Sequence, residues 1–121
     1  MFCLMPKILT QEEKIRREFS EAKLTDAFVE IAELAGFLMY HTHDSRRSQA
    51  GFPDWTLVRN GRLVFVELKK ELGKTKPEQD LWLEELNKCK GVEAYLWRPS
   101  DLRDGTMDTV LLTEPTSKKD N

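Results

Sequence analysis

The sequence lacks the features that mark several large classes of protein. It has no apolar run close to the roughly 18 residues that a membrane-spanning helix needs. Its only two cysteines, Cys3 and Cys89, have neither metal-ligand spacing nor a pairing pattern, which excludes a disulfide-rich secreted miniprotein and a structural zinc module. The apolar N-terminal MFCLMPKIL has no basic leader and no small-residue cleavage site, so we expect no signal peptide. A reducing cytoplasm is the expected location.

No internal repeat and no low-complexity linker divides the chain. Its 121 residues are enough for one packed core, and a content of 40% apolar and 33% charged residues is typical of a globular domain. We expect an N-terminal helical extension over residues 1–19, a single domain over residues 20–112, and a polar, disordered tail over residues 113–121.

The net charge of -2 conceals an uneven distribution of charge along the chain. Residues 45–76 carry eight basic and three acidic side chains, a local net charge of +5, which leaves -7 for the remaining residues. Such asymmetry predicts one basic face, which would suit a polyanionic partner. Solvated charges on a hairpin would give the same count, so charge alone leaves both interpretations open.

Alternation and turn signals predict four strands, and helical spacing predicts the helices around them. The two central strands are joined by Asn60-Gly61, the strongest short hairpin signal. The expected strands cover residues 37–42, 54–59, 62–69 and 92–97. The expected helices are one over 10–35 with a break near Ser20 and an end at Gly36, one that the Thr75–Glu78 capping box opens and that ends near Lys90, and a short last one that Ser100 or Asp101 caps and Gly105 interrupts. The order αβββαβ plus a short C-terminal helix predicts an α/β domain with a mixed central sheet flanked by helices.

The register of the predicted hairpin brings two carboxylates together. A two-residue turn pairs Arg59 with Arg62, and continuing the ladder sets Asp54 opposite Glu67, with Cβ atoms about 4.5–5.5 Å apart. Lys69 follows Glu67 by two residues and therefore shares its face. Like charges directly opposite each other are destabilising, and a hard divalent cation would compensate them. A structural carboxylate–lysine pair at a strand end is the alternative interpretation.

Three short motifs in this order resemble a known family. Gly51-Phe52-Pro53-Asp54, Glu67-Leu68-Lys69 and Pro77-Glu78-Gln79 resemble the PD-(D/E)xK nucleases, and specifically the stand-alone VRR-NUC type found in phages and bacteria. Weaker similarity extends over about residues 20–102. The resemblance implies a restriction-endonuclease-like core and an endonuclease that hydrolyses phosphodiester bonds in DNA with Mg²⁺ or Mn²⁺. It also suggests branched or four-way-junction DNA as the substrate, in the cytoplasm of a bacterial or phage-infected cell.

The resemblance also implies roles for individual residues. Asp54, Glu67 and the backbone carbonyl of Leu68 would hold the metal, and Lys69 would orient or help to deprotonate the attacking water. Gln79 matches a glutamine of the family, and the helical wheel predicts an inward position for it because it shares a face with Trp82, Leu83 and Leu86. A solvated polar residue in the first helical turn is the alternative for Gln79.

Further residues are candidates at the edge of this site. Glu21 heads the inward face of the first long helix, either as an additional metal ligand or as an ordinary acidic residue that favours the helix dipole. Basic and polar residues close to the motifs could contact phosphates or other parts of a nucleic acid, namely His41, Arg46, Arg47, Ser48, Lys70 and Lys74.

Three functional interpretations follow from the sequence. The first is a small DNA endonuclease, for which a symmetric homodimer would suit a two-stranded or junction substrate, because one domain of this size cannot embrace a junction. The second is a non-cleaving nucleic-acid-binding module, or a nuclease subunit that requires a partner. The intact set of Asp54, Glu67 and Lys69 argues against it. The third, an acidic interaction domain, leaves the basic segment and the carboxylate pair unexplained.

Overall fold

The computed structural model of the chain describes Thr10, residues 20–43 and residues 48–114. The predicted α/β class is confirmed, and the last helix is split into two short ones. The elements are α2 (Glu21–Leu34), β1 (Leu38–His41), β2 (Trp55–Arg59), β3 (Arg62–Leu68), α3 (Pro77–Lys88), β4 (Val92–Trp97), α4 (Pro99–Arg103) and α5 (Thr106–Leu112). The predicted extension over residues 1–19 and the predicted tail over residues 113–121 lie almost entirely outside the described residues, so these boundaries stay predictions.

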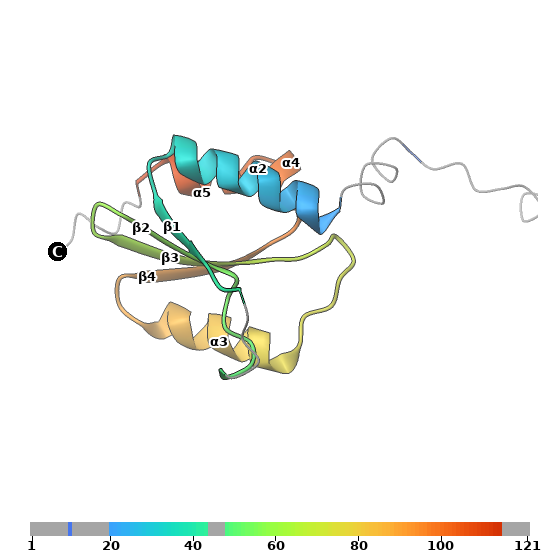
Figure 1. The fold of residues 1–121 in the computed structure, drawn as a ribbon, viewed down its shortest axis with the longest axis vertical. Coiled ribbons are helices and arrows are strands. Elements are labelled where there is room, and N and C mark those ends of the chain that lie inside the picture. Colours follow the sequence, from blue (N-terminus) through green and yellow to red (C-terminus); the bar gives the residue numbers. More distant parts are fainter. Residues whose placement is uncertain (1–9, 11–19, 44–47, 115–121) are drawn as a thin grey trace, which may run out of the picture.

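The four strands form one mixed sheet in the order β1-β2-β3-β4. β1, β2 and β3 are antiparallel neighbours, whereas β4 is parallel to β3 and reaches it through the crossover helix α3. Helices α2, α4 and α5 lie on one face of the sheet and α3 lies on the other (Figure 1). None of the helices in the described ranges is long and apolar enough to cross a membrane.

The Asn60-Gly61 turn sets the register of the central hairpin, as the sequence predicts. Both turn residues have positive φ, 54° for Asn60 and 81° for Gly61, which is the requirement of a type I′ turn. The ladder pairs Arg59 with Arg62 and continues without a bulge to Trp55 and Val66. One step beyond its end, the same register brings Asp54 beside Glu67.

The core lies between the sheet and the helices α2 and α5. β3 is central, and its residues Val64, Val66 and Leu68 are at most 2% exposed on this face. They pack against fully buried side chains of the two helices, namely Leu24, Phe28, Ala32, Met107 and Leu111. Burying a Leu, Val or Phe side chain contributes about 1.5–3 kcal/mol, so this face holds the sheet in place. The opposite face of β3 carries Glu67.

Two helix starts differ from the sequence prediction for the same reason. α3 and α4 begin with Pro77 and Pro99, so their N-caps are the preceding residues Lys76 and Arg98, not Thr75 and Ser100 or Asp101. Proline is favoured at the first helical position because it needs no hydrogen bond for an N–H there. The C-terminal end of α3 also differs from the prediction: the helix ends at Lys88, two residues before the predicted end near Lys90.

Candidate metal and nucleic-acid site

Asp54 and Glu67 meet where β2 begins and β3 ends. The Asp54 backbone N–H donates a hydrogen bond to Glu67 Oε1 at 3.2 Å, and Asp54 Oδ2 accepts one from the Leu68 N–H at 3.4 Å. Glu67 is only 4% exposed. The two carboxylates therefore form a partly desolvated pair, as the register of the hairpin predicts.

Burial and mutual repulsion disfavour the charged forms of this pair. Burial raises the pKa of Glu67, the negative charge of Asp54 raises it further, and together they bring it from 4.5 to about 7. Burial also raises the pKa of Asp54 above its ordinary value, although the hydrogen bond from Leu68 opposes that shift. The ammonium of Lys69 lowers the pKa of both carboxyl groups, so Lys69 lies close enough to act on each of them.

The Leu68 carbonyl is directed toward the same side of the strand as Asp54. In an extended strand the N–H and the C=O of one residue point the same way, and the Leu68 N–H points to Asp54. The hairpin register places Pro53 opposite Leu68, and proline has no N–H to donate. The Leu68 carbonyl therefore receives no ladder hydrogen bond from this position. It is a candidate third oxygen ligand beside the two carboxylates.

Gln79 joins the carboxylate pair to the start of α3. Its Nε2 donates to Glu67 Oε2 at 2.9 Å, and its Oε1 accepts from the Lys76 N–H at 2.8 Å. One side chain thus caps the helix and fixes the orientation of Glu67. The predicted inward face of α3 is confirmed, since its half-buried residues include Gln79, Trp82, Leu83 and Leu86.

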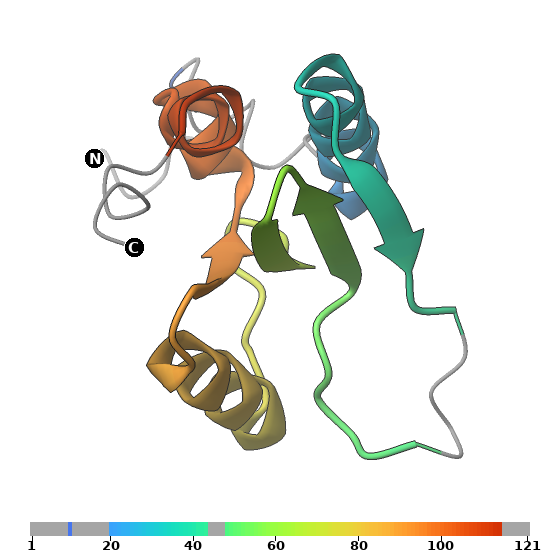
Figure 2. The ribbon, with the colours of Figure 1, turned by 90° about the vertical axis from the view of Figure 1, so that its left-hand side faces the viewer.

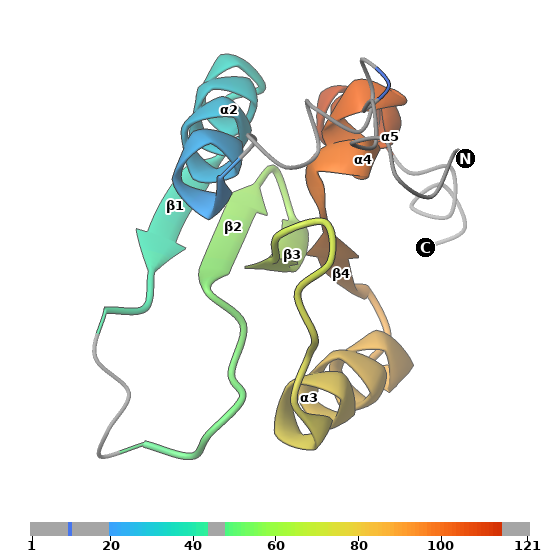
Figure 3. The ribbon, with the colours of Figure 1, turned by 90° about the vertical axis from the view of Figure 1, so that its right-hand side faces the viewer.

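The segment before Asp54 is docked onto α3, a contact that the sequence analysis missed. The Trp82 indole N–H donates to the Ala50 carbonyl at 3.1 Å, and the Phe52 and Trp82 rings pack edge to face with centroids 5.1 Å apart. At Gly51, which has a φ of 97°, an added Cβ would lie 2.6 Å from the Glu78 carbonyl carbon. The glycine in the Gly-Phe-Pro-Asp motif was the one signal of this close approach. Figure 3 shows the green segment that leads into β2 on the same side of the sheet as α3.

Glu21 and His41, on two further elements, lie close enough for their charges to act on the carboxylate pair. Glu21 is exposed in the first turn of α2, and its charge contributes to the raised pKa of Glu67. His41, at the end of β1, stacks on Trp55 with ring centroids 4.4 Å apart, and its charge lowers the pKa of Asp54. The structure therefore brings both of these candidates to the carboxylate end of the sheet. Figure 2 views the molecule from the opposite end, where the turn between β2 and β3 lies.

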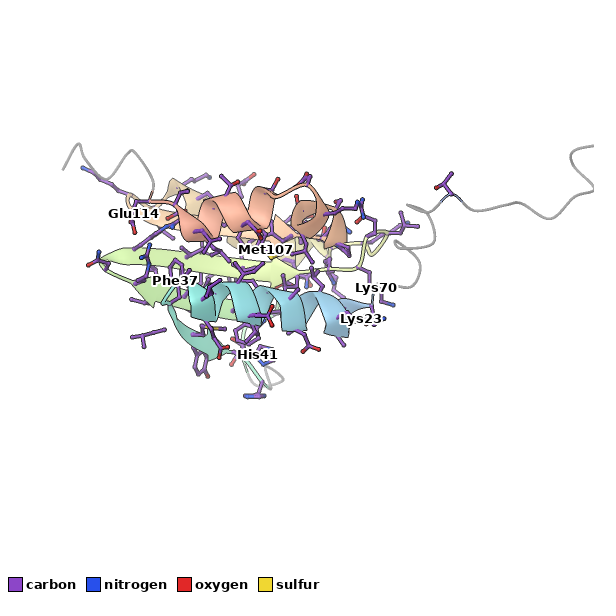
Figure 4. All side chains as sticks on the ribbon, turned by 90° about the horizontal axis from the view of Figure 1, so that it is seen from above. Lys23, Phe37, His41, Lys70, Met107 and Glu114 are labelled. Atoms are coloured by element: carbon purple, nitrogen blue, oxygen red, sulfur yellow. The ribbon has the colours of Figure 1, made fainter. Side chains whose placement is uncertain are left out.

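The structure describes only some of the residues that the sequence predicts to contact nucleic acid. Ser48, Lys70 and Lys74 are exposed, whereas Arg46 and Arg47 lie outside the described residues. Lys70, just beyond the end of β3, and Lys23, in the first turn of α2, lie at the same end of the molecule (Figures 1 and 4). These two lysines place exposed positive charge at this end of the molecule.

The donor set fits a hard divalent cation. Across the described residues, no group of three or more His, Cys, Asp or Glu side chains is placed to hold a metal ion. The candidate donors are instead the oxygens of Asp54, Glu67 and the Leu68 carbonyl. Such a set suits Mg²⁺ or Mn²⁺, which prefer oxygen ligands, and Mg²⁺ usually keeps several waters.

The match to a family model decides the classification. The model of the VRR-NUC domain matches residues 9–100, a span that includes Asp54, Glu67, Lys69 and Gln79. The chain belongs to the VRR-NUC family. A solved structure described as a VRR_NUC domain protein is similar, with 17% sequence identity and a TM-score of 0.48, over 70% of this chain and 83% of that one. No curated protein matches the chain. Membership in the VRR-NUC family implies nuclease-type activity on DNA, and the helix-flanked mixed sheet is consistent with the VRR-NUC nuclease fold.

Proposed function

We propose that this VRR-NUC chain is a metal-dependent endonuclease that hydrolyses phosphodiester bonds in DNA. The observation that carries the proposal is the desolvated pair of Asp54 and Glu67, with Lys69 close to both carboxylates. A protein that needed only a stable strand end would gain nothing from a buried like-charge pair, because such a pair costs folding free energy. The pair is explained by a bound cation.

Each residue of the site has a distinct proposed role. Asp54, Glu67 and the Leu68 carbonyl would hold Mg²⁺ or Mn²⁺, which supplies Lewis-acid activation of the phosphate and of water. Gln79 holds Glu67 in orientation through its hydrogen bond to Oε2. Lys69 would orient the attacking water, help to remove its proton and stabilise the negative charge that develops on the phosphate. Glu21 is proposed as a further carboxylate that would help to hold the cation.

The proposed substrate is DNA with a branch or junction. Ser48, Lys70 and Lys74 are exposed and would bind the DNA backbone, together with His41, Arg46 and Arg47. A single domain of 14.1 kDa covers only one arm of a junction, so we propose that two copies act as a symmetric homodimer on such a substrate. Sedimentation of the protein with and without four-way DNA tests this part of the proposal.

A single gel tests the activity. Labelled linear, nicked, flapped and four-way DNA is incubated with the protein in Mg²⁺, Mn²⁺ or EDTA, beside the Glu67→Ala variant in every condition. We expect cleavage in Mg²⁺ or Mn²⁺, no cleavage in EDTA, and no cleavage by Glu67→Ala. A parallel set of RNA substrates distinguishes DNA from RNA as the target.

Two results would contradict the proposal. Equal cleavage by the wild type and by Glu67→Ala would show that the activity arises elsewhere, or from a contaminant. Gel shifts without cleavage under every metal condition would support the non-cleaving binding module, or a subunit that requires a partner. Calorimetry with Mn²⁺ adds an independent check, because Asp54→Asn should lose metal binding even where no DNA is present.

A further inference from the structure

The segment that follows Lys69 is tied to the corner between β4 and α4. Three backbone carbonyls converge on one nitrogen of the Arg98 side chain. Arg98 Nη1 donates to the carbonyl oxygens of Lys70 at 2.7 Å, Glu71 at 3.1 Å and Gly73 at 2.7 Å. The segment from Lys69 to Lys76 belongs to no helix or strand, so these bonds replace the ladder that ended at Leu68.

Two further hydrogen bonds reinforce the same junction. The Lys69 N–H donates to the Trp97 carbonyl at 3.0 Å, and the Glu71 carboxylate accepts from the Ser100 N–H at 2.9 Å. The backbone before the Lys69 side chain is therefore fixed by Trp97, and the backbone after it by Arg98. Trp97, the last residue of β4, and Arg98, which follows it, thus hold the backbone on both sides of Lys69.

The corner between β4 and α4 is packed against the core. Trp97 is 2% exposed and packs against the Phe28 ring of α2, with centroids 6.2 Å apart. Pro99 is buried, and the Arg98 N–H donates to Asp101 Oδ2 at 2.8 Å in the first turn of α4. The corner that carries Arg98 therefore packs against the core, whereas the segment that Arg98 holds is a surface loop. Figure 4 shows Lys70, in this loop, at the edge of the molecule.

We propose that Arg98 is a positioning residue for Lys69, because its three carbonyl contacts hold the loop in the one conformation that directs the Lys69 ammonium to Asp54 and Glu67. This inference rests on the proposed nuclease function. Arg98 acts through the backbone of the loop and not on the phosphate. Loss of the Arg98 side chain should therefore slow the chemical step without lowering the affinity for DNA. Displacement of a reacting group by about 1 Å costs on the order of 100-fold in rate.

The substitutions Arg98→Met and Arg98→Lys test the proposal. All three contacts come from one nitrogen, so a lysine ammonium with three donors can make them in part, whereas methionine makes none. Arg103→Met is the matched control, because it removes the same charge from an exposed position at the end of α4. Glu71→Ala loosens the same loop without altering Arg98, and it serves if Arg98→Met fails to fold.

Three measurements give the expected result. Single-turnover cleavage by Arg98→Met should fall about 100-fold, and Arg98→Lys should recover to within about tenfold of the wild type. The DNA dissociation constant should change less than about threefold, since positioning of Lys69 is separate from backbone binding. Amide hydrogen exchange over residues 70–74, including the Gly73 N–H that donates to the Lys70 carbonyl, should accelerate in Arg98→Met.

Other outcomes would overturn the positioning role. A loss of DNA affinity that matches the loss of rate, with no recovery in Arg98→Lys, would mark Arg98 as a phosphate contact. An unchanged rate, or unchanged exchange in the loop, would show that Arg98 does not hold Lys69. If the wild type cleaves no nucleic acid, the nuclease proposal fails. The exchange experiment then still decides whether Arg98 fixes the loop.

Discussion

Glu67 is a carboxylic acid in a site that disfavours its ionisation. Its folded-state pKa of about 7 exceeds the ordinary 4.5, so between these values the folded protein keeps a proton that the unfolded chain has released. The free energy of unfolding of the metal-free protein should therefore fall as the pH rises from about 4.5 to about 7 and level off above that. At about 1.4 kcal/mol per pKa unit, the decrease is about 3 kcal/mol.

Urea unfolding in EDTA between pH 4.5 and pH 8 measures this effect. The Glu67→Gln variant is the reference, because it cannot ionise, and only the pH dependence of the difference is compared. We expect the wild type to lose about 3 kcal/mol more than the variant over this range. Parallel pH profiles for the two proteins would show that Glu67 titrates normally and that the site is not desolvated.

Lys69 should be dispensable for metal binding and essential for cleavage. It is close to both carboxylates, yet it contributes no oxygen ligand, so Lys69→Ala should bind Mn²⁺ at least as tightly as the wild type. Cleavage should drop by about 100-fold or more because the attacking water loses its positioning group. Calorimetry and a cleavage assay on the same preparation check both statements. Equal cleavage by variant and wild type would refute the role of Lys69.

The central residues of the site could be predicted because local rules determine them. The Asn60-Gly61 turn predicts the register of the hairpin. Strand alternation predicts that Glu67 and Lys69 share one face, and the helical wheel predicts an inward position for Gln79. The contact of Gly51 with Glu78 could not be predicted in this way, because a loop has no periodicity. The place where a loop docks depends on the packing of distant elements.

At the scale of elements, the loop before Asp54 and the helix α3 form one unit. Gly51→Ala would drive a Cβ to within 2.6 Å of the Glu78 backbone, so the loop must move, and Asp54 follows it three residues later. Gly91→Ala is the matched control, since Gly91 also has a positive φ of 80° but no atom within 4 Å of the added Cβ. Both variants bear the same backbone strain, about 1 kcal/mol, but only Gly51→Ala bears the clash.

Unfolding and cleavage measurements separate these contributions. Gly51→Ala should be destabilised by at least about 1–3 kcal/mol more than Gly91→Ala, in the range that overpacking usually costs. Below its unfolding temperature it should also cleave DNA more slowly, whereas folded Gly91→Ala should cleave like the wild type. Equal stability and equal activity of the two variants would show that the loop does not rest on α3.

The helix boundaries show where sequence rules conflict. Thr75-Lys76-Pro77-Glu78 reads as a capping box that starts at Thr75, yet the proline at the first helical position makes Lys76 the cap. The cap hydrogen bond is made by Gln79 with the backbone of Lys76, while Gln79 also bonds Glu67. A site residue thus took over the capping role. A pattern that considers the helix alone does not show this.

Across the whole molecule, the ends of β3 serve different purposes. Glu67 stands near one end, and Arg62, at the other, is 3% exposed and binds both carboxylate oxygens of Glu93 at 2.6 and 2.8 Å. Arg62 also donates to the carbonyls of Val110 and Thr113, which ties the C-terminal end of α5 to the sheet. The first end carries a like-charge pair that Lys69 compensates only in part, whereas the second holds Arg62 in an ion pair with Glu93.

Arg62→Met should destabilise the whole domain without impairing the site. Removing one partner of a buried ion pair leaves the other charge uncompensated, so we expect a loss of about 3 kcal/mol in urea unfolding. Arg62→Met combined with Glu93→Gln should recover part of that loss, because no lone charge remains. Lys88→Met, which breaks the exposed Lys88–Glu85 pair, should have no measurable effect on stability.

The folded Arg62→Met protein should cleave at the wild-type rate, since Arg62 is six residues of extended strand away from Leu68. A lower rate in the folded variant would mean that the two ends of β3 are coupled.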